Sequence, residues 1–250
     1  MDLGLAGRVY IISGGSSGLG RATAEVLVDD GARVVIGSRS ADKVEAAARD
    51  LGGSAHALGV VADLAEAAAP QRLVEAARTG YDGLDGALIS VGGPPAGPVL
   101  GITDEQWRAS YESVFVGALR LVRAVAGHLG EGGSIALVLS TSVRSPVPNL
   151  AISNGLRPGL AMLTKELADE LGDRGIRVNA LMPGRVDTQR VRDLDGGDPE
   201  VRRTQESRIP LGRYGAPAEF GRIAAFLLSP AASYLNGSLI PVDGGLLRAL

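Results

Sequence analysis

The sequence lacks cysteine and contains only two histidines, His56 and His128. Without cysteine the chain can form no disulfide and carry out no thiolate chemistry. Two histidines are too few for the usual ligand sets of zinc, so we expect no metal site. A chain without cysteine is compatible with the reducing cytoplasm.

A strong charge of one sign and long apolar runs are also missing. The formal net charge is −3 and the pI is about 5.5, so the chain has no basic field that would attract nucleic acid or an anionic membrane surface. No apolar run approaches the ~20 residues that span a bilayer. The opening residues, MDLGLAGRVYIISGG, lack the basic start and cleavage site of a signal peptide. These absences predict a cytoplasmic protein whose partner is a small molecule.

The sequence does contain a repeated unit, in which a short apolar strand precedes a helical stretch. RVYIISGG precedes GLGRATAEVLVDDG, and ARVVIGS, AHALGVVAD and DGALISVGG are each followed by a further helical stretch. Strands without polar alternation are typical of a parallel sheet that is covered on both faces. We predict a single α/β domain over residues 1–250, a Rossmann-type doubly wound sheet of about seven mostly parallel strands with helices on both faces.

Two segments interrupt this pattern. Residues 92–101, GGPPAGPVLG, are too rich in glycine and proline for a helix or strand, and we expect a shaped loop. Residues 188–215 are polar, charged and interrupted by turn residues, which predicts a partly helical insertion. Ligands of open parallel sheets bind beyond the carboxyl ends of the strands, where both segments are expected. Residues 188–215 are therefore our candidate lid.

The stretch SGGSSGLG places Gly14, Gly18 and Gly20 between the first strand and the first helix. Glycine permits positive φ and close backbone approach, and the start of a helix offers free N–H groups to a diphosphate. A tight turn that needs glycine only for steric reasons is the alternative. In a chain of repeated strand–helix units, this spacing favours a dinucleotide site.

The end of the second strand indicates which dinucleotide is bound. An acidic residue commonly binds the ribose of NAD there, whereas this chain has Ser38 followed by Arg39, which can bind a 2′-phosphate. We therefore predict NADP, with NAD as the alternative if Arg39 is only a solvated charge. Asp63, after the third strand, could accept a hydrogen bond from the adenine amino group or cap the following helix.

Three motifs together resemble the short-chain dehydrogenase/reductase family over essentially the whole chain. The glycine spacing matches the family's TGxxxGxG with Ser13 in place of threonine, RVNALMPGRVDT matches its sixth strand and PG turn, and IPLGRYGAPAEF through VDGG matches its C-terminal third. The resemblance implies a hydride-transferring enzyme with a nicotinamide cofactor. Together with the glycine turn, it gives these expected cofactor-binding residues: Gly14, Ser16, Ser17, Gly18, Leu19, Gly20, Ser38, Arg39, Asp63, Leu64, Gly92, Arg157, Pro183, Gly184 and Val186.

The family's catalytic residues are only partly retained. In the family a tyrosine transfers the proton, a lysine four residues later binds the ribose and lowers the tyrosine's pKa, a serine holds the substrate oxygen, and an asparagine completes a proton relay. Ser140 matches the serine, and its distance from residue 153 favours it over Ser142. The tyrosine position holds Ser153, the lysine position Arg157, and the asparagine position Val114.

These departures change the expected chemistry. A serine hydroxyl is too weak an acid to replace tyrosine without an adjacent base, and an arginine stays protonated under ordinary conditions. We expect Ser140 to line the site, and Ser153 and Arg157 to bind and orient rather than to transfer a proton. The guanidinium of Arg157 could hold either the ribose hydroxyls or a substrate carboxylate. Tyr111 lies one helical turn before Val114 and is the candidate substitute proton donor, unless its ring simply packs against a neighbour.

The leading hypothesis is an NADP-preferring short-chain oxidoreductase that acts on a carbonyl or alcohol of a small molecule with a non-standard proton donor. The alternatives are a redox-silent sensor or partner subunit that binds the cofactor, and a non-redox isomerase or dehydratase that uses the same pocket. The resemblance also implies a homodimer or homotetramer, formed through the long helices and the C-terminal strand.

Overall fold

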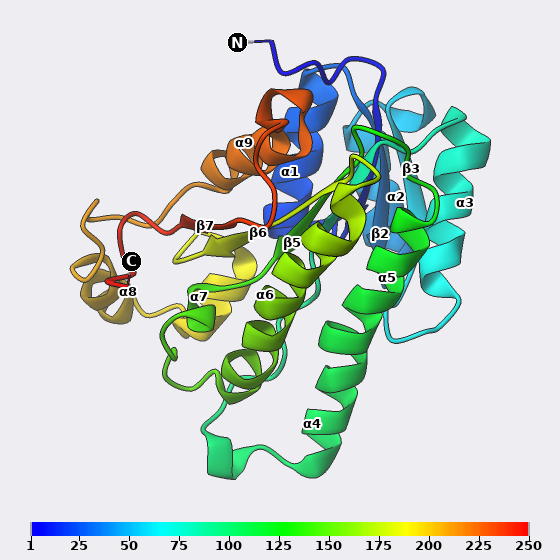
Figure 1. Cartoon of the computed structure of the whole chain (residues 1–250). Coiled ribbons are helices and arrows are strands. Elements are labelled where there is room, and N and C mark those ends of the chain that lie inside the picture. Colours follow the sequence, from blue (N-terminus) through cyan, green and yellow to red (C-terminus); the bar gives the residue numbers. More distant parts are fainter. Residues whose placement is uncertain (1, 250) are drawn as a thin grey trace.

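The apolar runs form one seven-stranded sheet in the computed structural model, which describes residues 2–249 (Figure 1). Every strand pairing is parallel, and the strand order is β3-β2-β1-β4-β5-β6-β7. This confirms the predicted doubly wound fold. The strands are β1 (Val9–Ser13), β2 (Arg33–Ser38), β3 (Ala57–Val61), β4 (Gly86–Ile89), β5 (Ser134–Val138), β6 (Arg177–Pro183) and β7 (Leu239–Val242).

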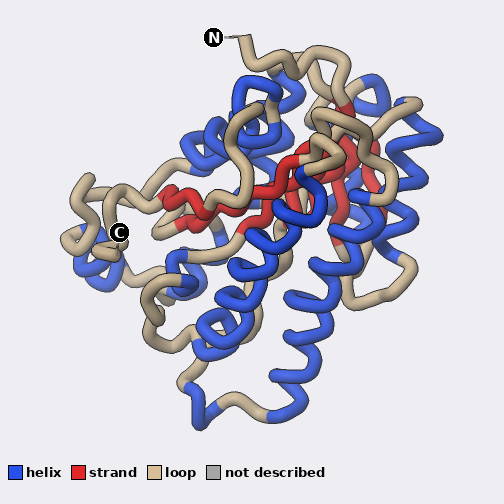
Figure 2. Tube along the Cα trace, in the orientation of Figure 1, coloured by secondary structure: helices blue, strands red, loops and turns tan. Residues whose placement is uncertain are grey.

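Helices cover both faces of the sheet (Figure 2). One layer contains α1 (Gly18–Asp29), α2 (Ala41–Asp50) and α9 (Pro217–Leu228). The other layer contains α3 (Ala69–Tyr81), α5 (Gly117–Ala126) and α6 (Ala151–Gly172). The chain winds in opposite directions from β1, which creates the switch point at which ligands of such sheets bind.

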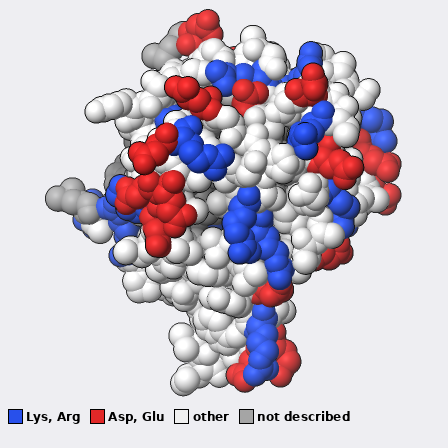
Figure 3. Space-filling model, turned by 45° about the vertical axis from the view of Figure 1, so that its right-hand side comes forward, with Lys and Arg blue, Asp and Glu red and all other residues white. Residues whose placement is uncertain are grey.

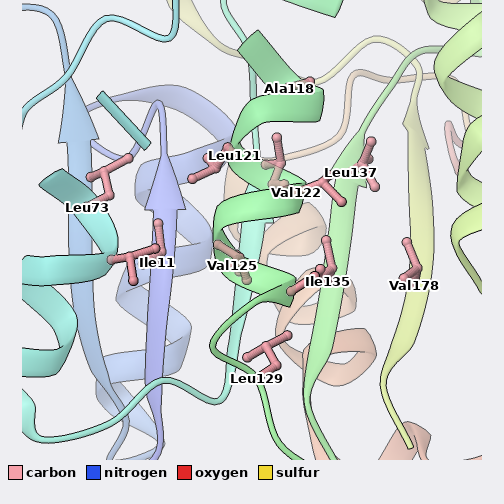
Figure 4. Packing of buried hydrophobic residues seen from close by; sticks show 14 of the residues in the cluster. Ile11, Leu73, Ala118, Leu121, Val122, Val125, Leu129, Ile135, Leu137 and Val178 are labelled. Carbon is pink, nitrogen blue, oxygen red and sulfur yellow. The ribbon is translucent and has the colours of Figure 1, made fainter. Parts of the chain in front are cut away.

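Each strand contributes side chains to both layers, and this is why the strands are mostly apolar on both faces. In β1, Ile11 belongs to the core beneath α3 and α5, whereas Tyr10 and Ile12 belong to the core beneath α1 and α9. Figure 4 shows Leu121 and Val125 of α5 packed over Ile11 and its neighbours on the sheet. Burying one such side chain contributes about 1.5–3 kcal/mol, so the two cores hold the cleft-forming ends of the strands in place.

The helical stretch that follows DGALISVGG is interrupted. It begins as α4 (Asp104–Ser110), continues as a π-helical turn (Tyr111–Val116) and runs on as α5. A π turn accommodates an extra residue and is frequent at functional sites. The sequence predicted one regular helix here because the apolar pattern continues across the turn.

Glycines on α6 bring this helix close to the interrupted one. A Cβ on Gly155 would lie 3.0 Å from the Trp107 ring, and one on Gly159 would lie 2.9 Å from the Phe115 ring. Pro158 lies inside α6 between these two contacts, and it lacks the N–H that would donate to the preceding turn. The rings of Trp107 and Phe115 therefore hold α4 and the π turn against α6. Residues of α4 and the π turn form one wall of the cleft.

The predicted lid contains two short helices, α7 (Gln189–Leu194) and α8 (Pro199–Glu206). The other irregular segment, residues 92–101, is a loop that ends in a 3-10 turn, Val99–Gly101. In the part of the chain that the structure describes, no helix is both long enough and apolar enough to cross a membrane. Figure 3 shows basic and acidic side chains interspersed on the face that it draws, in keeping with the small net charge.

Candidate cofactor and substrate cleft

A cleft of about 810 Å³ opens at the carboxyl ends of β1 to β6, where the strand order reverses. All residues that the sequence predicted for the cofactor and the chemistry line this cleft, except Tyr111. They are Gly14, Ser16, Ser17, Gly18, Leu19, Gly20, Ser38, Arg39, Asp63, Leu64, Gly92, Ser140, Ser153, Arg157, Pro183, Gly184 and Val186. The structure brings these residues together, and their contacts to a ligand stay predictions.

The turn after β1 needs glycine at two positions for its backbone conformation and at a third for close packing. Gly14 and Gly18 have φ of 64° and 56°, in the left-handed region. A Cβ on Gly20 would lie 2.4 Å from the carbonyl oxygen of Gly14. The N-cap residue of α1, Ser17, makes no side-chain cap, and the first turn has no acidic residue. The first N–H groups of α1 therefore remain available, and the turn fits the diphosphate of a dinucleotide.

The residues beyond β2 and β3 form one end of the cleft. The hydroxyl of Ser16 donates to the hydroxyl of Ser38 at 2.9 Å. Arg39 is exposed and pairs with no carboxylate within residues 2–249. Asp63 accepts a hydrogen bond from the backbone N–H of Ala65 at 3.0 Å, which stabilises the turn that precedes α3. Its second oxygen remains available, so a contact to the adenine amino group stays a prediction.

Three predicted residues meet at the end of β5. Ser140 and Ser153 both line the cleft, and the hydroxyls of Ser153 and Ser142 lie 3.2 Å apart. Ser142, the alternative match to the family's serine, is buried and donates its backbone N–H to the Ser140 hydroxyl at 3.1 Å. The guanidinium of Arg157 donates to the carbonyl oxygen of Val138 at 2.8 Å.

Arg157 is a buried cation, with 7% of its surface exposed. Burial lowers its pKa to about 10, with the nearby charge of Arg190 as a further cause. At neutral pH the guanidinium is therefore still protonated. No buried side-chain nitrogen among residues 2–249 lacks a hydrogen-bond partner, so the nitrogens of Arg157 that have no protein partner reach the solvent of the cleft.

Tyr111 lies outside the cleft. It is 48% exposed, and its ring stacks on Phe115 with centroids 5.2 Å apart. Ser110, Ser113 and Val114 from the same helix do line the cleft. The π turn breaks the 3.6-residue period, so Tyr111 and Val114 do not share the face that a regular helix would give them. The expectation that the Tyr111 hydroxyl faces the cleft is corrected.

The cleft contains few groups that could exchange a proton. Among the described residues that line it there is no tyrosine, lysine or histidine. Its ionisable residues are Arg39, Asp63, Glu105, Arg157 and Arg190. Glu105 is 81% exposed at the start of α4, where it faces solvent. Proton transfer in this cleft therefore cannot rely on a phenol, an amine or an imidazole of its own lining.

Comparisons with known proteins agree with this geometry. A family model described as enoyl-(acyl carrier protein) reductase matches residues 14–247. The chain is 34% identical to cis-4-hydroxycyclohexanecarboxylate dehydrogenase of Sinomonas cyclohexanicum, over 98% of each chain. It is 33% identical to human dehydrogenase/reductase SDR family member 4, over 96% of this chain and 88% of the relative. The chain belongs to the short-chain dehydrogenase/reductase family.

A solved structure of this short-chain dehydrogenase/reductase family overlays the whole chain. It is L-sorbose reductase from Gluconobacter frateurii in complex with NADPH and L-sorbose, with a TM-score of 0.92, 31% identity and 100% of each chain covered. The family and these relatives are oxidoreductases, and the sorbose reductase structure holds NADPH. A nicotinamide cofactor in the cleft agrees with these neighbours.

One cleft residue of this short-chain dehydrogenase/reductase was missed by the sequence reasoning. Arg190 of α7 lines the cleft and donates to the carbonyl oxygen of Pro94 at 2.6 Å. It packs so closely on Gly93 that a Cβ there would lie 2.5 Å from its Nε. Arg192, two residues further along α7, instead pairs with Asp187 at 2.8 Å. No local signal in the sequence separates these two arginines.

Ion pairs and hydrogen bonds hold residues 188–215 against the turn that follows β6. The carboxylate of Asp195 is buried and accepts hydrogen bonds from the Tyr214 hydroxyl and from Arg185. Asp187 accepts from Arg192, and this contact lowers the pKa of the Asp187 carboxyl. These contacts position Arg190 beside the cleft.

Proposed function

We propose that this protein is an NADP-preferring oxidoreductase that interconverts a carbonyl and an alcohol on a small organic substrate. The supporting observation is that one cleft joins a glycine turn with available N–H groups, an arginine at the end of β2, and the Ser140, Ser153 and Arg157 group at the end of β5. When bound, the nicotinamide supplies or accepts the hydride.

The names of the relatives favour a hydroxylated small molecule as substrate. They include cis-4-hydroxycyclohexanecarboxylate dehydrogenase, 2,5-dichloro-2,5-cyclohexadiene-1,4-diol dehydrogenase from Sphingobium indicum and L-sorbose reductase. The two dehydrogenase names specify a hydroxylated compound that is oxidised, and the reductase name specifies a sugar that is reduced. The same class of substrate suits a cleft whose serines can hold an alcohol oxygen.

We assign the cofactor preference to Arg39. Its guanidinium is exposed at the cleft, pairs with no carboxylate in the described chain, and follows the neutral Ser38. A guanidinium can form two parallel hydrogen bonds to a phosphate, which the 2′-phosphate of NADP supplies and NAD lacks. The absence of an acidic residue at position 38 removes the group that would repel that phosphate.

We propose that water, rather than a tyrosine, exchanges the proton. On the family resemblance, Ser153 and Arg157 take the places of the tyrosine and the lysine. Burial raises the pKa of Tyr81 and of Tyr214 to about 12 and also raises that of Tyr10, so none of these phenols approaches neutral pH.

In this proposal the chain's own residues stabilise the reacting oxygen. The hydroxyls of Ser140 and Ser153 bind the substrate oxygen and stabilise the negative charge that develops on it. In the reductive direction, water that reaches this oxygen through the open cleft gives up a proton to it, and the hydroxide that remains is released to bulk solvent.

The experiment follows the absorbance of NADPH while a panel of ketones and aldehydes is added. The proposal expects a fall in absorbance with some of these substrates, and a faster fall in the double variant Ser153→Tyr with Arg157→Lys, which introduces a phenol and an amine. Activity in the double variant beside a flat trace in the native protein would contradict the proposal. That outcome would instead support the alternative of a redox-silent protein that binds the cofactor.

Four features of the whole molecule belong to the same proposal. We propose that the chain acts as one domain, that residues 188–215 close over the bound substrate, that it works in the cytoplasm, and that it forms a homodimer or homotetramer. Met162 on α6 is 75% exposed and Tyr111 on the π turn is 48% exposed, which supports an interface along these helices. Light scattering on the purified protein would measure the number of subunits.

A further inference from the structure

The guanidinium of Arg157 is a charge without a counter-ion. It is almost fully buried, and its protein hydrogen bond is to the carbonyl oxygen of Val138. No carboxylate within residues 2–249 forms an ion pair with it. A buried charge is costly unless an opposite charge compensates it. The arrangement therefore calls for an anion from outside the chain.

The glycine turn that would hold the cofactor's diphosphate is too far from Arg157 for the diphosphate to be that anion. Arg157 lies at the end of β5, whereas the glycine turn follows β1, and β4 lies between these strands. Neighbouring strands are ~4.8 Å apart, so the two strand ends are separated by roughly 10 Å. The free N–H groups of α1, which would bind the diphosphate, lie at the other end of the cleft.

Arg190 adds a second cation at the same end. Its guanidinium donates to the carbonyl oxygen of Pro94 in the loop that follows β4, and its charge is near enough to lower the pKa of Arg157. No carboxylate of residues 2–249 forms an ion pair with Arg190. The two carboxylates of the cleft do not neutralise the pair. Asp63 follows β3, on the far side of β1, and the Glu105 side chain is exposed at the start of α4.

We propose that Arg157 and Arg190 together bind a carboxylate group of the substrate, so that the substrate is a keto acid or a hydroxy acid. This inference rests on the proposed function and specifies its substrate class. Two guanidinium groups can each donate two parallel hydrogen bonds to a carboxylate, which fixes its orientation as well as its charge. The carboxylate would then lie at the end of β5, next to Ser140. The reacting carbon of the substrate would lie in the same part of the cleft.

The test is direct binding, measured by calorimetry on protein saturated with NADP⁺, in which no reduction can occur. The probes are pyruvate, levulinate, benzoylformate and 4-oxocyclohexanecarboxylate, each compared with its neutral methyl ester. We expect at least one acid to bind roughly tenfold or more tightly than its ester, as one well-paired charge provides. In Arg190→Gln this preference should disappear, whereas the affinity for NADP⁺ should stay within about threefold of the native value.

Arg192→Gln is the matched control, because Arg192 lies on the same helix and its guanidinium pairs with Asp187 instead of facing the cleft. This variant should keep the full preference for the acid. Arg157→Gln should also lose the preference for the acid over its ester. If this substitution of a buried residue prevents folding, Arg190→Gln still tests the inference.

Three results would overturn the inference: equal binding of every acid and its ester, an unchanged preference in Arg190→Gln, or an equal loss of preference in Arg192→Gln. A loss of NADP⁺ affinity in Arg190→Gln with an unchanged acid preference would assign Arg190 to the cofactor. If NADP⁺ does not bind the native protein, the proposed function fails by itself. The same acid and ester titrations on the cofactor-free protein then still measure the charge preference.

Discussion

Replacing Arg39 by alanine tests how this protein chooses between its two possible cofactors. The guanidinium lies at the cleft beyond β2 and pairs with no carboxylate among residues 2–249, so its removal breaks no ion pair. Hydrogen bonds between charged groups contribute about 1.5–3 kcal/mol. Because Arg39 is exposed, solvent screening reduces this gain, and we expect about 1.4 kcal/mol, or a tenfold loss of NADPH affinity.

The assay is calorimetric titration of the native and variant proteins with NADPH and with NADH. The dissociation constant for NADPH should rise about tenfold in Arg39→Ala, and the constant for NADH should change by less than about twofold. Arg123→Ala is the control, since Arg123 is exposed on α5 and does not line the cleft. If Arg39→Ala weakened the binding of both cofactors equally, or of neither, Arg39 would not bind the 2′-phosphate.

Three further predictions follow from single contacts. In Gly20→Ala the new Cβ would lie 2.4 Å from the carbonyl oxygen of Gly14. We therefore expect the free energy of unfolding, measured by thermal denaturation, to fall by about 1–3 kcal/mol and NADPH binding to be lost. Unchanged NADPH binding in calorimetry would contradict this. Arg213 and a backbone N–H lower the pKa of Glu219 to about 2 from 4.5, so its carboxylate stabilises the fold above pH 4.5 and this contribution is lost as the pH falls towards 2. Urea unfolding of Glu219→Gln should therefore show a smaller loss of stability over that range than the native protein. Tyr111→Phe should leave turnover unchanged and alter the free energy of unfolding by no more than about 0.5 kcal/mol, because the hydroxyl lies outside the cleft. A loss of turnover would instead indicate that the Tyr111 hydroxyl is the proton donor.

Much of the fold could be predicted from the sequence, because its signals are local. The apolar runs recur between helical stretches, and glycine at positions 14, 18 and 20 marks the turn at which strand becomes helix. The structure has the seven parallel strands that this pattern predicts. The residues expected at the cofactor come together because every strand of a parallel sheet ends at the same edge.

The sequence predicted less of the candidate site where one helix departs from regular geometry. The pattern around Tyr111 and Val114 is that of an ordinary helix, on which the two residues would share a face. The π turn separates them, and packing of Phe115 against Gly159 accompanies it. Hydrophobic periodicity carries no information about an extra residue in one turn, so the orientation of Tyr111 could not be predicted.

The sequence by itself determined the order of strands and helices, the glycine turn, and the chemical types available at residues 140, 153 and 157. These depend on neighbours within a few positions along the chain. Only the tertiary structure decided that Arg190, and not Arg192, faces the same cleft as Arg157. That choice depends on where α7 packs against the loop after β4, and such a contact between distant segments is set by the folded surface rather than by any local pattern.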